Sequence, residues 1–148
     1  MSASYDIARA PGHLIRRAQQ IAVAEFAREM VAFDVTPVQF ALLNAMIETP
    51  GVDQITLANG VAFDAATSGS VIGRLEAKGW VKREPDPHDR RRKLLYVTAE
   101  GRRAVARMKV AVDRVQHNIL APLAASDREV FMRLLAQLVA GHEQTPGA

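Results

Sequence analysis

The hydrophobic pattern of this 148-residue chain changes at Gly79, and this change restricts the possible folds more than any other feature. Before Gly79, apolar residues recur with a helical period. After it come "WVKRE" (residues 80–84) and "KLLYV" (residues 93–97), two short runs rich in branched and aromatic side chains. Such runs are typical of β-strands, and the proline-bearing turn between them favours a hairpin. We therefore predict a mainly α fold that contains one small antiparallel β-hairpin.

The chain before the hairpin carries start and stop signals for four helices. Thr36 and Pro37 fit the N-cap and the first position of the second helix, which Pro50-Gly51 stops. Asp64 fits the N-cap of the fourth helix, and Gly79 fits the position just past its end. We predict these helices over residues 11–33, from residue 37 to the Pro50-Gly51 stop, over residues 53–59 and over residues 64–78.

Two more helices are expected after the hairpin. The first covers residues 98–120, and Pro122 interrupts the pattern behind it. Ser126, with Glu129 three residues later, matches a capping box that would start the last helix, which runs to about residue 140.

A short helix, a turn, a second helix and then a hairpin is the order of elements in a winged helix-turn-helix. In that arrangement the second helix enters the major groove of DNA and the hairpin reaches the neighbouring backbone or minor groove. The helix over residues 64–78 fits the first role. Thr67, Ser70 and Arg74 share one face of it, Ser68 is nearby, and all four can hydrogen-bond bases or phosphates.

Gly69 and Gly73 lie inside this helix, where each costs about 1 kcal/mol relative to alanine. They leave a low-profile surface. Such a surface allows close approach to a DNA groove or to another helix, and tight packing on a neighbouring helix of the same chain explains it equally well.

Positive charge is concentrated at the tip of the hairpin. The chain has 19 basic and 16 acidic residues, and residues 82–93 alone hold six basic and three acidic ones, so this segment accounts for the whole excess of +3. Arg90, Arg91 and Arg92 suit insertion into a narrow minor groove, and Asp89 could brace one of them by a charge-assisted hydrogen bond. The alternatives are a solvated charged loop, or a wing that docks an acidic protein without sequence-specific DNA binding.

Composition argues against an enzyme. The chain has no cysteine, its four histidines lack metal-ligand spacing, and it has no glycine-rich phosphate loop and no supported serine–histidine–acid pattern. We expect no catalytic residue and no metal site. No apolar run approaches the roughly 18 residues of a membrane span and no signal peptide opens the chain, so we expect a cytoplasmic protein with no membrane partner.

The segment "DPHDRRRKLLYVTAEG" resembles the wing signature of the multiple-antibiotic-resistance regulator (MarR) family, an Asp-x-Arg followed by Leu-Thr and then Gly. Asp89, Arg91, Thr98 and Gly101 match it, and Val97 replaces the usual leucine. The upstream "ITLANGVAFDAATSGSVIGRLEAKGWVKRE" resembles the helix-turn-helix and first wing strand of that family. The resemblance covers residues 11 to about 140.

The resemblance implies one domain over residues 1–148, with a winged helix-turn-helix at 36–97 and dimerisation helices at 6–33 and 98–141. It implies an obligate homodimer on a pseudo-palindromic double-stranded DNA operator, usually as a repressor that a small molecule releases. The residues support part of this independently, because "ILAPLAAS" and "VFMRLLAQLVA" give the last helices broad apolar faces.

A possible effector site lies in the first helix, in "GHLIRRAQQ". His13, Arg16, Arg17 and Gln20 share a polar face there, and an arginine could clamp a carboxylate while apolar neighbours enclose a ring. Solvated residues or interdomain ion pairs are the alternative. "LIRRAQQ" and "TPVQFALL" are similar to the branch of the family that controls aromatic-acid catabolism, which implies an aromatic acid, a phenolic or a coenzyme A thioester as effector, and no cofactor.

Overall fold

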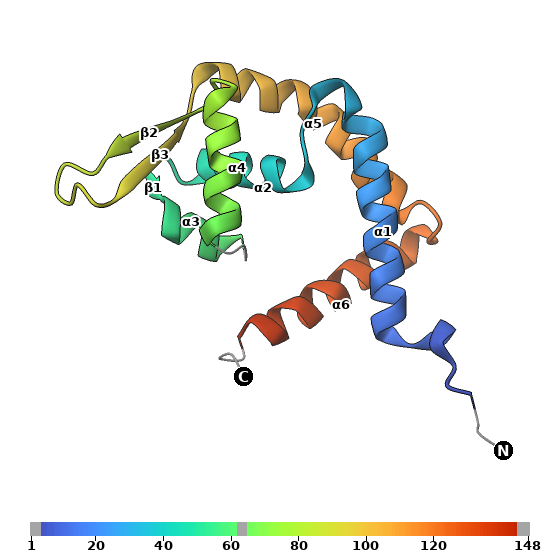
Figure 1. Ribbon diagram of the computed structural model, residues 1–148. Helices are drawn as coiled ribbons and strands as arrows, with labels where there is room; N and C mark the ends of the chain where they lie inside the picture. The colour runs from blue at the N-terminus through green and yellow to red at the C-terminus, as the bar shows by residue number, and fades with distance from the viewer. Residues whose placement is uncertain (1–3, 62–64, 145–148) are drawn as a thin grey trace.

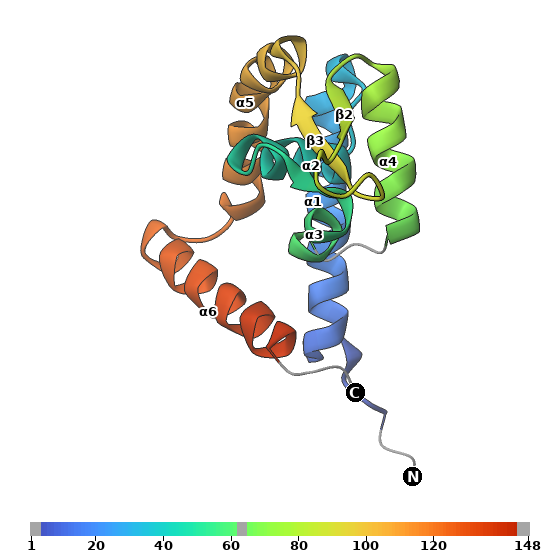
Figure 2. The ribbon, with the colours of Figure 1, turned by 90° about the vertical axis from the view of Figure 1, so that its left-hand side faces the viewer.

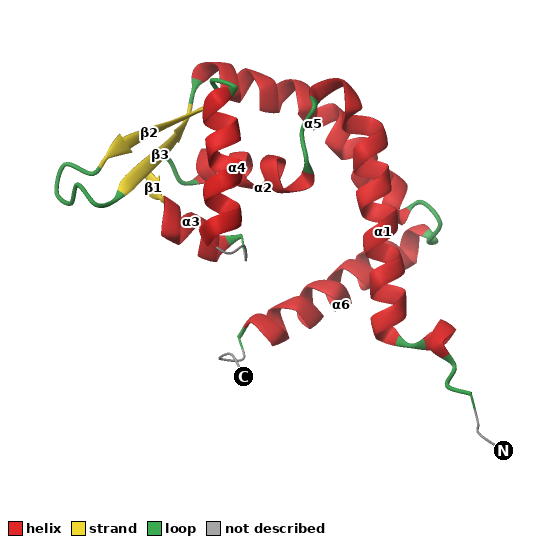
Figure 3. Cartoon of the chain, viewed as in Figure 1, coloured by secondary structure: helices red, strands yellow, loops and turns green. Residues whose placement is uncertain are grey.

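Three strands and six α-helices make up the described part of the molecule, residues 4–61 and 65–144 of a computed structural model (Figures 1 and 3). In chain order the elements are the 3₁₀ turn η1 (Ile7–Arg9), α1 (Pro11–Met30), the 3₁₀ turn η2 (Val31–Phe33), α2 (Pro37–Glu48), β1 (Val52–Asp53), α3 (Gln54–Gly60), α4 (Ala65–Ala77), β2 (Val81–Pro85), β3 (Lys93–Val97), α5 (Ala99–Leu120) and α6 (Ala125–Glu143). The mainly α fold with a small β wing is confirmed.

The N-terminus of α2 is stabilised by two side chains, and not only by the Thr36 cap predicted above. Thr36 accepts a hydrogen bond from the backbone of Gln39, and the Gln39 side chain accepts one from the backbone of Thr36, each at 3.2 Å. This reciprocal pair is a capping box. Together with Pro37 at the first helical position, it fixes where the helix-turn-helix begins.

The sheet has a third strand that the sequence analysis missed. Its order is β1-β3-β2 with both pairs antiparallel, and Val52 of β1 lies opposite Leu95 of β3. β1 has only two residues, too few for a period-2 pattern to be visible. Its second residue, Asp53, also caps α3, so the sheet and the helix-turn-helix meet at this residue.

The end of α4 and the start of α5 are joined by one threonine. Gly79 has φ +78°, the left-handed conformation expected just past a helix end, and the predicted cap Asp64 lies outside the described residues. Thr98 caps α5 by accepting from the backbone N–H of Gly101 (3.0 Å) and donates its hydroxyl to the carbonyl of Gly79 (2.7 Å). The hairpin is therefore clamped where both of its strands meet the helices.

The capping box predicted from Ser126 and Glu129 is wrong. Helix α6 begins at Ala125 with Ala124 as its N-cap and no side-chain cap, so Ser126 lies within the first turn. The turn is set from another side: Arg128 donates to the carbonyl of Leu123 at 3.1 Å and to that of Ala121 at 3.5 Å. The helix also continues past residue 140, to Glu143.

The core lies beneath the wing and reaches α1 and α5, whereas α6 buries none of its residues. Its largest fully buried side chains are Met30, Leu42, Leu43, Met46, Ile72, Leu75, Leu95, Met108 and Val115. In two views at right angles, α6 lies apart from the part that holds α2–α4 and the sheet (Figures 1 and 2). Within residues 4–61 and 65–144 no single helix is long and apolar enough to cross a bilayer, and one helix pair, Pro11–Phe33 with Pro37–Glu48, meets the length and composition test only jointly, with a 73° bend.

Candidate nucleic-acid interface and effector cleft

Helix α4 presents three of its four predicted contact residues to solvent. Thr67, Ser70 and Arg74 are exposed, in agreement with their shared face. Ser68 is fully buried. It lies on the inward face with Ile72 and Leu75, because positions i, i+4 and i+7 of a helix point the same way, so its inclusion among the DNA-contacting residues is corrected here.

The two glycines of α4 lie next to side chains of this chain. A Cβ on Gly69 would be 3.0 Å from Nε2 of Gln54 in α3, and a Cβ on Gly73 would be 3.9 Å from Nη2 of Arg83 in β2. A methyl group on Gly69 would therefore require the end of the Gln54 side chain to shift, which favours packing within the chain among the alternatives left open above. Gly73 has room for a methyl group but not for a long side chain in the present position of Arg83.

The tip of the wing is a tight, hydrogen-bonded loop. The backbone N–H of Asp86 donates to the carbonyl of Arg92 (3.0 Å), and that of Arg92 donates to the carbonyl of Asp89 (2.9 Å). The Asp89 carboxylate accepts from the backbone N–H of Arg91 at 3.0 Å. Asp89 therefore braces the backbone of the tip, and not a guanidinium as expected.

Arg92 is directed toward the body of the protein. Its guanidinium pairs with Asp53 at 2.7 Å and lies 3.9 Å from Asp86. Hydrogen bonds from the hydroxyl and the backbone N–H of Thr56, and then the Arg92 guanidinium, hold the pKa of Asp53 well below its usual range. The pair raises the pKa of Arg92 in turn, chiefly through the hydrogen bond to Asp53. Arg92 thus ties the wing to the start of α3.

Arg90 and Arg91 are the cations that remain available at the tip. Both are exposed, and neither guanidinium has a hydrogen bond or an ion pair with another residue of the described segments. The loop that carries them is ordered by Asp86 and Asp89, so the two charges project from a fixed base. This is the arrangement that a phosphate backbone or a narrow minor groove would meet.

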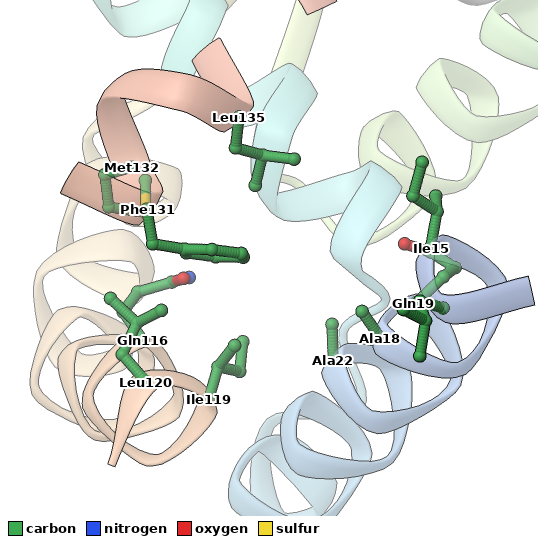
Figure 4. Close-up of a pocket in the computed structure, with 11 residues that line it drawn as sticks. Ile15, Ala18, Gln19, Ala22, Gln116, Ile119, Leu120, Phe131, Met132 and Leu135 are labelled. Carbon is green, nitrogen blue, oxygen red and sulfur yellow. The ribbon is translucent and has the colours of Figure 1, made fainter. Parts of the chain in front are cut away.

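A hollow of about 590 Å³ opens between α1, α5 and α6 (Figure 4). Phe131 of α6 points into it, and its polar lining residues are Gln19 of α1 and Gln116 of α5. The full lining is Leu14, Ile15, Ala18, Gln19, Ala22, Gln116, Ile119, Leu120, Phe131, Met132 and Leu135. Apolar walls with two amides suit a ring that bears one or two polar substituents, or a second protein surface.

The four predicted effector residues do not line this hollow. At about 100° per residue, His13, Arg16, Arg17 and Gln20 lie on the face of α1 opposite to Ala18 and Ala22. They pair with each other along the helix: Arg16 donates to Nδ1 of His13 at 3.0 Å, and Arg17 donates to the Gln20 amide oxygen at 2.9 Å. The structure brings them together as a polar face, separate from the hollow.

Sequence reasoning missed Gln19, Gln116 and Phe131. The helical period shows that Phe131 and Leu135 share a face, and that signal was available. It does not reveal which residues of α1 and α5 oppose them. Within the described ranges 4–61 and 65–144, no group of three histidine or acidic residues is placed to hold a metal ion.

Comparisons with known proteins agree with this fold. Residues 33–92 match the model of the MarR family. The transcriptional regulator HosA of Escherichia coli O111:H- is 32% identical over 127 residues, which cover 86% of this chain and 93% of HosA. Two similar solved structures are those of the PcaV transcriptional regulator of Streptomyces coelicolor in complex with its natural ligand and of Bordetella bronchiseptica BpsR, whose DNA binding is regulated by 6-hydroxynicotinic acid.

The two structures superpose over nearly the whole chain. PcaV is 39% identical with a TM-score of 0.86, over 94% of this chain and 98% of its own. BpsR is 29% identical with a TM-score of 0.87, over 93% and 98%. The predicted wing motif, the fold and these relatives agree, and relatives of this kind are regulators and not enzymes. The chain belongs to the MarR family.

Proposed function

We propose that this protein is a ligand-responsive transcriptional repressor that binds a pseudo-palindromic operator as a homodimer. The observation that carries the proposal is the pair Arg90 and Arg91, two exposed cations without a partner in the described chain, at the tip of a hairpin that Asp89 orders from within. A long planar cation on a fixed base suits the negative potential of a minor groove.

Helix α4 supplies the second contact. Thr67, Ser70 and Arg74 are exposed on it and offer two hydroxyls and a guanidinium, which can hydrogen-bond base edges or phosphates in the major groove. The helix lies beside the wing, so one winged domain spans a major groove and the adjacent minor groove.

The second copy belongs at the hollow and along α6. Phe131, Leu135 and Leu138 are 37–45% exposed although they are large and apolar, and no residue of α6 is buried within one chain. A contiguous apolar face of this kind marks a protein interface. Two tethered winged domains then bind an operator far more tightly than one does.

For the effector we propose an aromatic carboxylate, a phenolic or an aromatic coenzyme A thioester. The similarity to BpsR supports this, because its named regulator, 6-hydroxynicotinic acid, is an aromatic carboxylate. A ring in the hollow would meet the amides of Gln19 and Gln116. A carboxylate held by Arg16 or Arg17 would lie on the other side of α1, so the two positions are separable by substitution.

The DNA-binding test uses a duplex selected from a random library by the purified protein, and a scrambled duplex of the same composition. We expect nanomolar binding to the selected duplex by fluorescence anisotropy, with a steep loss of affinity as salt rises. Equal affinity for both duplexes would contradict sequence-specific regulation and favour a wing that docks an acidic protein.

The effector test is a calorimetric titration with 6-hydroxynicotinic acid, benzoic acid, phenol and benzoyl-coenzyme A, followed by DNA binding in their presence. We expect at least one to bind and to weaken operator binding. Gln116→Leu should abolish that response if the ring occupies the hollow, and Arg16→Met or Arg17→Met should abolish it if the polar face of α1 holds the carboxylate. An absence of heat and of any effect on DNA binding with all four would exclude this effector class.

A further inference from the structure

Arg83 of β2 is a charged residue on the inward side of the wing. Along the strand, Val81 is buried and Lys82 and Glu84 are exposed, so Arg83 shares the inner face with Val81. It lies opposite Leu95, which is fully buried, and its own side chain is only 28% exposed. A partly buried arginine needs a polar or charged partner, because its guanidinium has lost part of its hydration.

The partner is the backbone and surface of α4. Nη2 of Arg83 donates to the carbonyl of Gly69 at 3.4 Å, and Nε lies 3.7 Å from the carboxylate of Glu76. Nε is buried and makes no hydrogen bond, so its interaction with Glu76 is purely electrostatic. Gly69 and Glu76 are seven residues apart, which is about 10 Å along a helix. One guanidinium on the neighbouring strand therefore contacts groups from two residues that lie two turns apart on α4.

Gly73 leaves the space that the guanidinium needs. It lies between Gly69 and Glu76 on the same side of α4, and its Cβ position would be 3.9 Å from Nη2 of Arg83. A methyl group fits at ordinary contact distance, but a longer side chain would occupy the place of the guanidinium. The low-profile side of α4 is thus matched to a specific side chain of the wing.

We propose that Arg83 is a positioning residue that fixes the orientation of α4 relative to the wing, and that it thereby sets the sequence selectivity of DNA binding more than the overall affinity. This rests on the proposed function, in which α4 reads base edges. Readout of base edges requires donors and acceptors in a set geometry, whereas attraction to the phosphate backbone tolerates small rotations. A helix that is free to tilt on the wing therefore loses the readout of base edges but keeps the attraction to the phosphate backbone.

The test compares the affinities of full-length dimers for the selected duplex and for its scrambled counterpart. Arg83→Met keeps the length of the side chain and removes the guanidinium. We expect it to reduce the ratio of the two affinities at least tenfold, while binding to the scrambled duplex changes less than threefold. Arg83→Lys retains the charge but not the fork, and should reduce the ratio by a similar factor.

Lys82→Met is the matched control, because it removes one positive charge from the exposed side of the same strand. It should lower both affinities in proportion and leave their ratio unchanged. The slope of log affinity against log salt separates positioning from a direct DNA contact, since a lost phosphate contact reduces that slope by about one. We expect no change in slope for Arg83→Met.

A double-mutant cycle tests the role of the glycine. Gly73→Leu should reduce the affinity ratio in the wild-type background and add little in the Arg83→Met background, because both changes remove the same contact.

Any one of three results would overturn the inference. These are equal losses from Gly73→Leu in the two backgrounds, an affinity ratio in Arg83→Lys equal to that of the wild type, or a reduced salt slope in Arg83→Met. A wild-type protein that does not discriminate between the duplexes would overturn it together with the proposed function, whereas a discriminating wild type and a discriminating Arg83→Met variant would overturn the inference alone.

Discussion

At the scale of single residues, Gly101 has the least room for a side chain among the described glycines. A Cβ there would lie 2.3 Å from the carbonyl oxygen of Trp80 and 2.8 Å from the Val97 side chain. We expect Gly101→Ala to lower the free energy of unfolding by about 1–3 kcal/mol, because the backbone of the strand start must shift. Urea denaturation measures this. Gly12→Ala, where nothing lies within 4 Å, should cost little or stabilise slightly, and equal effects of the two changes would contradict the steric argument.

Asp53 gives a second prediction, on pH. The pKa of its carboxyl is lower in the folded protein than in the unfolded chain, where it is about 3.9. The folded state therefore binds fewer protons, and the contribution of Asp53 to stability is complete above about pH 5 and is lost as the pH falls through and below 4. We expect Asp53→Ala to cost about 1–2 kcal/mol at pH 7, mostly through the lost cap, and clearly less at pH 3.

Asp53→Asn is the control for that experiment. An asparagine still accepts the bond that caps α3 but carries no charge toward Arg92, whose half-exposed side chain leaves the ion pair screened by solvent. It should therefore cost less than Asp53→Ala at pH 7. Unfolding by urea at pH 7, 5 and 3 compares the three proteins, and a cost for Asp53→Ala that does not shrink with pH would contradict the assignment.

The sequence predicted the types of the site residues better than the directions of their side chains. Thr67, Ser70 and Arg74 were placed correctly on one face because helical spacing alone fixes that face. Ser68 was misplaced, since the spacing does not say which face the core covers until the position of α2 is known. The role of Asp89 was anticipated as a brace, but the preference of an aspartate for a backbone N–H two residues later determined its partner.

At the scale of elements, the wing combines two kinds of arginine, and their substitution should have different consequences. Arg91→Met removes a cation from the exposed tip in each copy of the dimer. We expect a loss of operator affinity of tenfold or more and a decrease of about two in the slope of log affinity against log salt. Fluorescence anisotropy at several salt concentrations gives both values.

Arg92→Met removes the link between the wing and α3. We expect a smaller decrease in the salt slope than for Arg91→Met, together with faster hydrogen exchange around Asp53 and Thr56, because the ion pair at 2.7 Å is lost. Exchange in that region should be unchanged in Arg91→Met. Identical salt slopes in the two variants would contradict the division into a contacting and a bracing arginine.

Local sequence signals predicted the helix ends correctly at Thr36, Gly79 and Thr98, where a cap or a glycine controls the end. The prediction failed at the start of α6, because Arg128 binds the carbonyls of Leu123 and Ala121 there and Ser126 does not cap the helix. The two-residue strand β1 was invisible for a similar reason. Its strand character comes from pairing with β3, a contact of more than 40 positions in sequence, and not from its own composition.

At the scale of the whole molecule, the sequence indicates that the terminal helices are too apolar to remain uncovered, but it does not predict the hollow that they form. The hollow between α1, α5 and α6 depends on how three helices cross, and a single helical period does not contain that information. The helical period of α1 predicts its polar face, but it does not show that the opposite face of the same helix borders the hollow.

The exposed face of α6 leads to the last prediction. Leu135→Glu places a charge in the centre of the apolar face that we assign to the second copy, and a buried unpaired carboxylate is costly. Because α6 buries no residue within one chain, the winged part should stay folded. We expect a monomer by sedimentation velocity, near-normal thermal unfolding of the winged part, and a loss of operator affinity of about 100-fold or more, since the two half-sites are no longer bound by tethered domains.

Arg133→Ala is the control, because residue 133 lies about 200° around α6 from Phe131. This variant should remain a dimer with unchanged operator affinity. If Leu135→Glu stayed dimeric and bound the operator normally, α6 would not form the subunit interface, and the hollow beside it would be open to an effector alone.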